Sequence, residues 1–125
     1  MALFSAGSLA ACTLTMLCAA GPVSPPPESA LTLTVRQADG VSRAVQLLCD
    51  PDAGTHPKAL EACTALEQAD GNFDALATTR QPCPMIHAPV RATAHGHWRG
   101  KPVRHTADYS NPCLADAESS GVFGF

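Results

Sequence analysis

The segment spanning residues 82–89, with the sequence PCPMIHAP, combines residue types that could meet the active site of another protein. Three prolines surround an apolar pair, Met85 and Ile86, and Cys83 stands two residues before the methionine. Pro84 fixes its own φ near about −65° and biases Cys83 toward an extended backbone. Methionine is a flexible apolar side chain that suits a roomy apolar pocket. The segment is therefore expected to be an exposed, extended loop that a serine endopeptidase could bind as it binds substrate.

Cleavage of such a loop need not separate its ends. A disulfide at Cys83 would keep the two new termini together after a cut between Met85 and Ile86, so religation would compete with hydrolysis. A loop held in its bound shape also loses little entropy on binding, which favours tight complexes at ordinary interface size. The plainer interpretation is a Pro-rich loop with a structural disulfide. On these residues alone the plainer interpretation is favoured, because Cys-Pro-Met is a short signal.

Composition narrows the function classes. The 125 residues suit one domain, and the formal net charge of −3 comes with no basic run or basic-aromatic cluster, which argues against nucleic-acid binding. The enzyme interpretation is also disfavoured, because the chain has no Gly-x-Ser-x-Gly elbow and no partnered carboxylate pair. Trp98 is expected in the core or on a sheet face.

The N-terminus resembles an export signal. Residues 1–20 contain no charged side chain and end in Cys-Ala-Ala, which suits signal-peptidase cleavage before Gly21, although no basic residue follows Met1. An alternative is a lipobox at residues 9–12, with Cys12 lipidated. Residues 21–29, including three consecutive prolines, are expected to form a stiff extended arm before a domain spanning 30–125. The protein is thus expected to be secreted, with no membrane contact after cleavage.

Removal of residues 1–20 leaves four cysteines. An even number of cysteines in a small exported domain indicates a disulfide framework. Four cysteines allow three pairings, and their spacing alone does not choose among them. The four are Cys49, Cys63, Cys83 and Cys113.

Hydrophobic periodicity predicts a small α+β domain. Residues 30–36 alternate apolar and polar side chains as in a half-buried strand, Asp39-Gly40 favours a hairpin turn, and residues 41–49 are expected to return as a second strand. Further strands are expected at 90–94, 98–105 and 121–125, with a turn around Gly96. Residues 50–54 and 78–89 are expected to be a turn and an exposed loop. Hairpin connections between short strands indicate an antiparallel sheet.

One helix is expected after residue 55. Thr55 is a plausible N-cap, Pro57 stands near the first helical position, and Gly71 suits the C′ position after the last turn. Apolar residues recur at helical spacing between them, at Ala59, Ala62, Cys63, Leu66 and Ala69. Phe73 and Leu76 are expected to fold back onto the core.

Histidines raise the question of a metal site. His95 and His97 flank Gly96, and His105 lies on the neighbouring predicted strand. A closed zinc site needs four ligands at defined geometry, and the cysteines are expected in disulfides. We therefore expect surface histidines, with no metal and no cofactor.

The order of several segments resembles the bacterial subtilisin-inhibitor family of actinomycetes. The signature is Cys83-Pro84-Met85 followed by an apolar residue. The other matching segments, in order, are ALTLTV (30–35), GTHP (54–57), Cys63, GNFDAL (71–76), PV (89–90), WRGK (98–101), YSNPC (109–113) and the terminal VFGF (122–125). Together they span nearly all of the chain after the arm.

This resemblance implies a fold and a function. The disulfides would be Cys49–Cys63 and Cys83–Cys113, in a five-stranded antiparallel sheet with two helices on one side, the second helix near Cys113. The protein would be a secreted inhibitor of subtilisin-like serine proteases and a homodimer joined through the sheet. Met85 would enter the primary specificity pocket, with Met85–Ile86 as the reactive bond. Family members with Lys or Arg at this position also act on trypsin, so trypsin inhibition by this chain is expected to be weak.

Two loop residues depart from the family pattern. Pro82 stands where a larger side chain, often Met, would reach the fourth pocket of the enzyme, and its presence is expected to weaken binding. His87 replaces an aromatic residue after Ile86, and a histidine in contact with the enzyme would make binding depend on pH. The alternative function is a secreted, disulfide-stapled binding or structural domain without protease inhibition.

Overall fold

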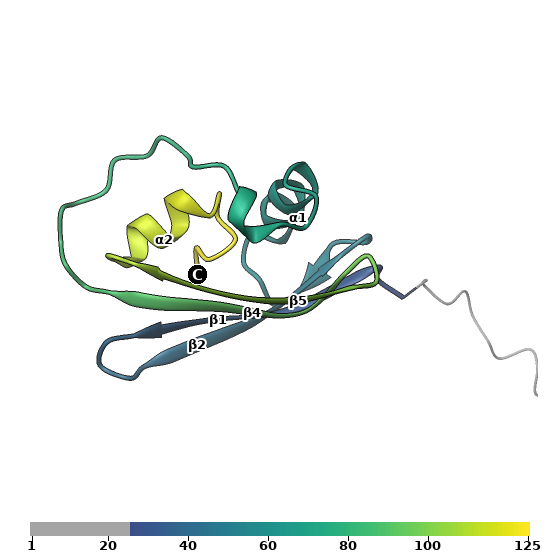
Figure 1. Ribbon diagram of the computed structural model, residues 1–125, viewed down its shortest axis with the longest axis horizontal. Helices are drawn as coiled ribbons and strands as arrows, with labels where there is room; N and C mark the ends of the chain where they lie inside the picture. The colour runs from purple at the N-terminus through teal and green to yellow at the C-terminus, as the bar shows by residue number, and fades with distance from the viewer. Residues whose placement is uncertain (1–25) are drawn as a thin grey trace, which may run out of the picture.

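The computed structural model describes residues 26–125, so the expected signal peptide, Cys12 and most of the Pro-rich arm lie outside the described residues. A single antiparallel sheet forms one layer, and both helices lie over one of its faces (Figure 1). The elements in chain order are β1 (Ser29–Gln37), β2 (Ser42–Cys49), β3 (Ala53–Gly54), α1 (Ala59–Gln68), the 3-10 turn η2 (Phe73–Ala75), β4 (Val90–Trp98), β5 (Lys101–Tyr109) and α2 (Pro112–Glu118). The predicted α+β class, five strands and two helices are confirmed.

The sheet has the strand order β3-β2-β1-β4-β5 and is antiparallel throughout. Central β1 alternates as predicted: Leu31, Leu33 and Val35 are buried, while Thr32 and Thr34 lie on the opposite face. Successive side chains of a strand point to opposite faces, so one face of β1 supplies the core and the other faces away from the helices. The buried partners on β4 are Val90, Ala92, Ala94 and Trp98.

The fifth strand is not the one that the sequence predicted. Residues 121–125 do not form a strand; they close local turns, in which the N–H of Gly121 donates to Asp116 O and that of Val122 to Ser119 O. The fifth strand is β3, which lies within the predicted turn at 50–54 and pairs with Leu47 and Leu48 of β2. Phe123 is nevertheless buried in the core.

The predicted turn at Gly96 is also wrong. β4 continues through Gly96 to Trp98, and the turn falls at Arg99 and Gly100, which both have positive φ. Gly96 has φ of 143°, and a Cβ there would overlap the carbonyl of Ala30 on β1. A glycine inside a strand can mark such a close approach of two backbones rather than a turn.

Helix α1 occupies the predicted region with different ends. Its N-cap is Lys58 without a side-chain cap, and Thr55 instead pairs with β2, its Oγ1 accepting from the N–H of Gln46. At the other end Asp70 takes the left-handed position, and Gly71 follows one place later than predicted, its N–H donating to Leu66 O at 2.8 Å. A Cβ at Gly71 would overlap the indole of Trp98, so glycine allows α1 to close onto the sheet.

Two disulfides have the pairing that the family resemblance implies. Cys49–Cys63 joins β2 to α1 across 14 residues, and Cys83–Cys113 joins the long loop to α2 across 30 residues. Phe73 is buried and Leu76 packs partly against the core, as predicted. None of the helices between residues 26 and 125 is long and apolar enough to cross a membrane.

Candidate functional site

A long loop, residues 76–89, connects η2 to β4 without regular secondary structure. It arches beyond α2 and returns to β4 at one end of the molecule (Figure 1). Met85 is completely exposed and Ile86 is more than half exposed, and they are two of the four large hydrophobic side chains that are exposed among the described residues. An exposed apolar pair at the tip of a loop is unusual enough to suggest a binding role.

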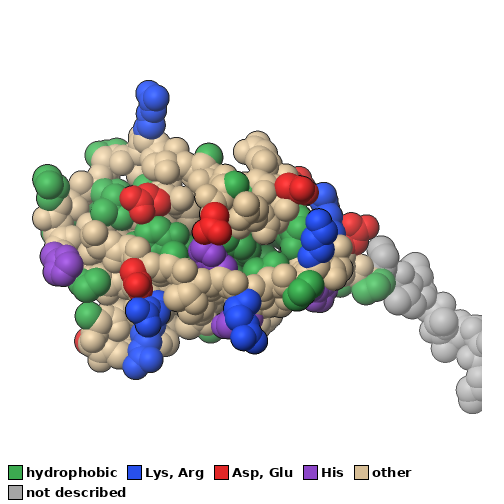
Figure 2. All heavy atoms as spheres, viewed as in Figure 1, with side chains coloured by type: hydrophobic (Ala, Val, Ile, Leu, Met, Phe, Trp, Pro, Cys, Tyr) green, Lys and Arg blue, Asp and Glu red, His purple; other side chains and the backbone are tan. Residues whose placement is uncertain are grey.

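Charge is not concentrated at this loop. Acidic and basic side chains are mixed over the face shown in Figure 2, and apolar side chains appear at the end of the molecule that carries the loop. The loop therefore offers a partner an apolar contact and a backbone rather than an electrostatic patch.

The two ends of the loop are held to the C-terminal part of the chain. Before the exposed pair, the N–H of Thr79 donates to Ala117 O at 2.8 Å, and Gln81 Nε2 donates to Asp116 Oδ2 at 3.4 Å. After the pair, the N–H of Ala88 donates to Ser110 O at 2.8 Å. The loop is therefore fixed at both flanks and leaves Met85 free at its tip.

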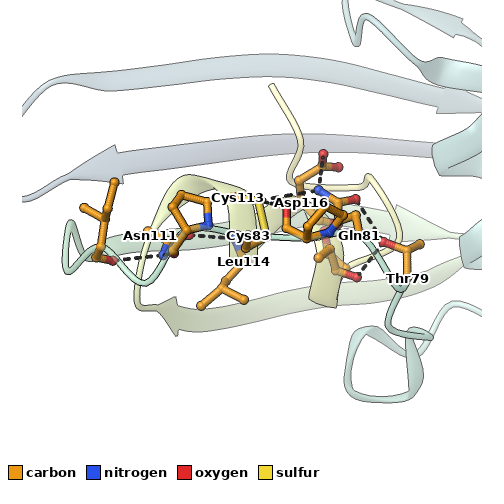
Figure 3. Close-up of a disulfide and its surroundings, with 12 residues drawn as sticks. Thr79, Gln81, Cys83, Asn111, Cys113, Leu114 and Asp116 are labelled. Atoms are coloured by element: carbon orange, nitrogen blue, oxygen red, sulfur yellow. Dashed lines mark hydrogen bonds between the residues drawn. A yellow bond between two sulfur atoms is a disulfide. The ribbon is translucent and has the colours of Figure 1, made fainter.

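Asn111 fixes the centre of the loop. Its Nδ2 donates to Pro84 O at 3.1 Å and to Ile86 O at 2.9 Å, the carbonyl groups on either side of Met85. The side chain is buried, with Asn111 only 3% exposed. Figure 3 shows the amide of Asn111 reaching the loop from the start of α2.

The same side chain also organises α2. Asn111 is the N-cap of the helix, its Oδ1 accepting from the N–H of Leu114 at 2.9 Å, and Pro112 occupies the first turn. Asparagine is a favoured N-cap and proline a favoured first helical residue. The cap fixes the orientation of the amide, so the helix end sets the position of the two donors that hold the loop.

The disulfide Cys83–Cys113 ties the loop to the same helix end. Cys113 lies in the first turn of α2, two residues after Asn111, and Cys83 is the one loop residue from 77 to 89 that is partly buried (Figure 3). A hollow remains between loop and body, lined in part by Met85, Ser110 and Leu114. The loop tip is thus held from behind by a covalent bond and two hydrogen bonds rather than by packing.

The structure brings together the predicted loop residues and adds one that was missed. Pro82, Pro84 and His87 are exposed beside the apolar pair, as expected of a loop that meets a partner. The added residue is Asn111, which the sequence marks only as part of the matching segment YSNPC (109–113). Its Asn-Pro pattern is a helix-start signal, but only the fold shows that the capped helix begins beneath the loop.

The other residues considered as metal ligands, the histidines of β4 and β5 and the cysteines of the first disulfide, lie away from the loop. His95 and His97 are exposed on β4, as expected. His105 was also expected on the surface, but its side chain is only 16% exposed and stacks on Phe73 with ring centroids 5.1 Å apart. Cys49, Cys63 and Asp52 lie close together, but the two sulfurs are joined in a disulfide and hold no free thiolate for a metal.

Comparison with known proteins assigns the family. The family model described as "Subtilisin inhibitor-like" matches residues 27–111. Protease inhibitor SIL-V2 of Streptomyces orinoci is 46% identical over 104 residues, which cover 78% of this chain and 95% of that protein. The subtilisin inhibitor of Streptomyces albogriseolus is 42% identical over 106 residues, covering 78% and 72% of the two chains.

A solved structure agrees with these relatives. Streptomyces caespitosus sermetstatin, in a crystal structure with Bacillus licheniformis subtilisin, superposes with a TM-score of 0.61 at 34% identity and covers 78% of this chain and 98% of its own. The chain therefore belongs to the subtilisin inhibitor-like family. It is a subtilisin-type serine protease inhibitor and not an enzyme.

Proposed function

We propose that the protein inhibits its target by offering residues 82–87 as a substrate-like strand, with Met85 in the primary apolar pocket and Met85–Ile86 as the reactive bond. The observation that carries the proposal is the pair of hydrogen bonds from Asn111 to the carbonyls of Pro84 and Ile86. They hold the backbone on both sides of one residue, and that residue is fully exposed and apolar. No other segment of residues 26–125 combines these features.

The mechanism follows from the tethers. When the protease attacks the Met85 carbonyl, the new amine of Ile86 remains held through its own carbonyl by Asn111 and through Ala88 by Ser110. The acyl half remains held by the disulfide at Cys83. The amine therefore stays beside the acyl-enzyme, where reformation of the peptide bond competes with attack by water.

Two neighbouring residues tune this contact. The exposed Pro82 presents a short, rigid side chain three residues before Met85, so the enzyme's fourth pocket would be poorly filled. The exposed His87 would lie on the leaving-group side of the reactive bond. The proposed target is a subtilisin-like rather than a trypsin-like protease, because the side chain before the reactive bond is uncharged.

We further propose that two copies associate through the sheet face opposite the helices, and that the protein acts outside the cell. Helices cover only one face of the sheet in the described chain (Figure 1). On that face Thr32, Thr34 and Thr93 form a patch of short side chains that allows a second sheet to approach, and His95 and His97 follow it toward the Trp98 end of β4. The two disulfides suit an oxidising compartment. Sedimentation equilibrium would give the mass of one chain rather than two if the face is unpaired.

The test is a titration of subtilisin activity with the oxidised chain, residues 21–125. Activity should fall linearly to near zero at one inhibitor chain per enzyme. Met85→Asp should abolish the effect, because a charged side chain cannot enter an apolar pocket, whereas Met85→Leu should retain it. Equal inhibition by Met85→Asp would refute the proposed reactive bond and leave a binding domain that acts through another surface.

A further inference from the structure

Two histidines lie side by side on the sheet face opposite the helices. His95 and His97 are both exposed on β4, and Ala94 and Trp98, which alternate with them, are buried. The register of β4 on β1 and β5 is unbroken through this region. Because alternate residues of a strand share a face, both imidazoles project from the same side of the sheet. Continuation of β4 through Gly96, in place of the predicted turn, is what makes them neighbours.

The spacing suits chelation. Residues two apart on a strand are separated by about 6.6 Å along it. A tetrahedral ion with metal–nitrogen bonds of about 2.1 Å needs two nitrogens about 3.4 Å apart. Each imidazole extends several bonds from its Cα, so the two rings can converge on one ion above Gly96, where no side chain intervenes. The backbone of β4 already holds the two histidines at this separation, so the free energy of ion binding is not spent on ordering the backbone.

The surroundings leave these rings free to bind. Neither ring takes part in an ion pair within residues 26–125. By contrast, His56 is buried against Val122 O and His105 stacks on Phe73. The cross-strand neighbours of His95 are Thr32 on β1 and Arg104 on β5. Arg104 is the nearest positively charged residue by register. Its repulsion should weaken cation binding without blocking it.

The donor set selects the kind of ion. Imidazole nitrogens suit zinc, copper and nickel, whereas magnesium and calcium prefer carboxylate oxygens. The positions next to the pair on the neighbouring strands are Ala30, Thr32, Pro102 and Arg104, which supply no carboxylate.

We propose that His95 and His97 form a two-histidine site for a divalent transition-metal ion such as Zn²⁺. The remaining coordination positions are open to water, or to the same pair from a second copy if two sheet faces meet there. The site lies toward the Trp98 end of β4, whereas the reactive loop joins β4 at Val90. It is therefore independent of the proposed inhibitory contact.

Isothermal titration of the untagged, oxidised chain (residues 21–125) with Zn²⁺ tests the site. Saturable binding is expected at one ion per chain, or at one ion per two chains if the site is shared, and either supports the site. His95→Asn and His97→Asn should each weaken binding by about tenfold or more, and the double variant should abolish it. The matched control is His87→Asn, which removes an exposed histidine from the loop and should leave Zn²⁺ binding unchanged.

Two further measurements test the electrostatics of the Zn²⁺ site and its separation from the inhibitory loop. Arg104→Gln should tighten Zn²⁺ binding, because it removes a positive charge next to the pair. The double histidine variant should still inhibit subtilisin stoichiometrically, which shows that it is folded and separates this site from the loop. Unchanged Zn²⁺ affinity in the double variant, or loss of binding in His87→Asn, would overturn the proposal.

Discussion

Asn111 brackets Met85: its side-chain amide donates to the carbonyl oxygens of the residues immediately before and after that methionine, at 3.1 and 2.9 Å. The same amide is buried and caps α2 through Leu114. One side chain therefore couples a helix end to the backbone around the proposed reactive bond. The shape of the loop is set by the folded body and not by the loop sequence alone.

Replacing Asn111 should convert the inhibitor into a better substrate. Asn111→Ser keeps a hydroxyl that can cap α2 but removes both donors to the loop. Two neutral hydrogen bonds contribute about 1–3 kcal/mol together, so inhibition of subtilisin should weaken by about 5- to 150-fold, and cleavage at Met85–Ile86 should accelerate.

A matched variant separates the two roles of Asn111. Asn111→Ala loses the cap as well as the donors and should unfold at a lower temperature than Asn111→Ser, while the two variants should be cleaved at similar rates. Thermal unfolding and a cleavage time course measure both effects. An Asn111→Ser variant that inhibits as tightly as the parent chain and stays intact would remove Asn111 from the mechanism.

The features that the sequence predicted best depend on local chemistry. The alternation of Leu31, Leu33 and Val35 reflects burial of one strand face, and the closely spaced prolines at 82–89 disfavour regular structure in the loop. The exposure of Met85 follows from its position among them. The disulfide pairing came from the family resemblance, because four cysteines have three possible pairings.

The wrong predictions share a physical cause. Gly96 suggests a turn in isolation, but the close approach of Ala30 makes it a strand residue, and the real turn uses Arg99, which rarely marks one. Thr55 has the chemistry of an N-cap, yet it pairs with Gln46 on β2. Each outcome depends on a partner distant in sequence, as does the contact of Asn111 with the loop.

Oxidation of Met85 should switch off inhibition. Met1 and Met16 precede residue 21, so Met85 is the only methionine in the chain 21–125. Sulfoxide formation turns its apolar side chain into a polar one, which an apolar pocket accepts poorly. Mild peroxide treatment should therefore raise residual subtilisin activity, whereas a Met85→Leu chain treated in the same way should inhibit as before. Equal sensitivity of the two chains would place the oxidisable contact elsewhere.

The two disulfides should have different roles. Cys83→Ser with Cys113→Ser frees the loop from α2 and should give rapid cleavage between Met85 and Ile86. Cys49→Ser with Cys63→Ser removes a link between β2 and α1, away from the loop, and is the matched control. Each pair should lower the free energy of unfolding by about 2–4 kcal/mol. Below both unfolding temperatures, only the first variant should be cut quickly; equal cleavage rates would show that general loosening, not the tether, is responsible.

His56 should make folding stability depend on pH. Burial lowers the pKa of His56 below its ordinary value of 6.5. Its neutral ring accepts from the N–H of Lys58 through Nδ1 and donates through Nε2 to Val122 O, both at 2.9 Å. Above pH 6.5 the ring is neutral in both states, and its full contribution is present. As the pH falls below 6.5 the unfolded chain binds the proton first, so stability is lost until the native ring protonates too.

Urea unfolding between pH 7.5 and 5 measures this dependence. His56→Gln should be less stable than the parent chain at pH 7.5 and should lose less stability as the pH falls. Parallel pH profiles for the two chains would contradict the assignment of the pH dependence to His56.

The most direct test of the proposed mechanism is to identify the bond that subtilisin cuts. The chain 21–125 is incubated for a long time with a catalytic amount of subtilisin, and the product is weighed by mass spectrometry before and after reduction of its disulfides. We predict one product, heavier by one water, which reduction separates into residues 21–85 and 86–125, and which still inhibits fresh enzyme before reduction. A cut at any other bond, or a Met85–Ile86 product that no longer inhibits, would contradict the account.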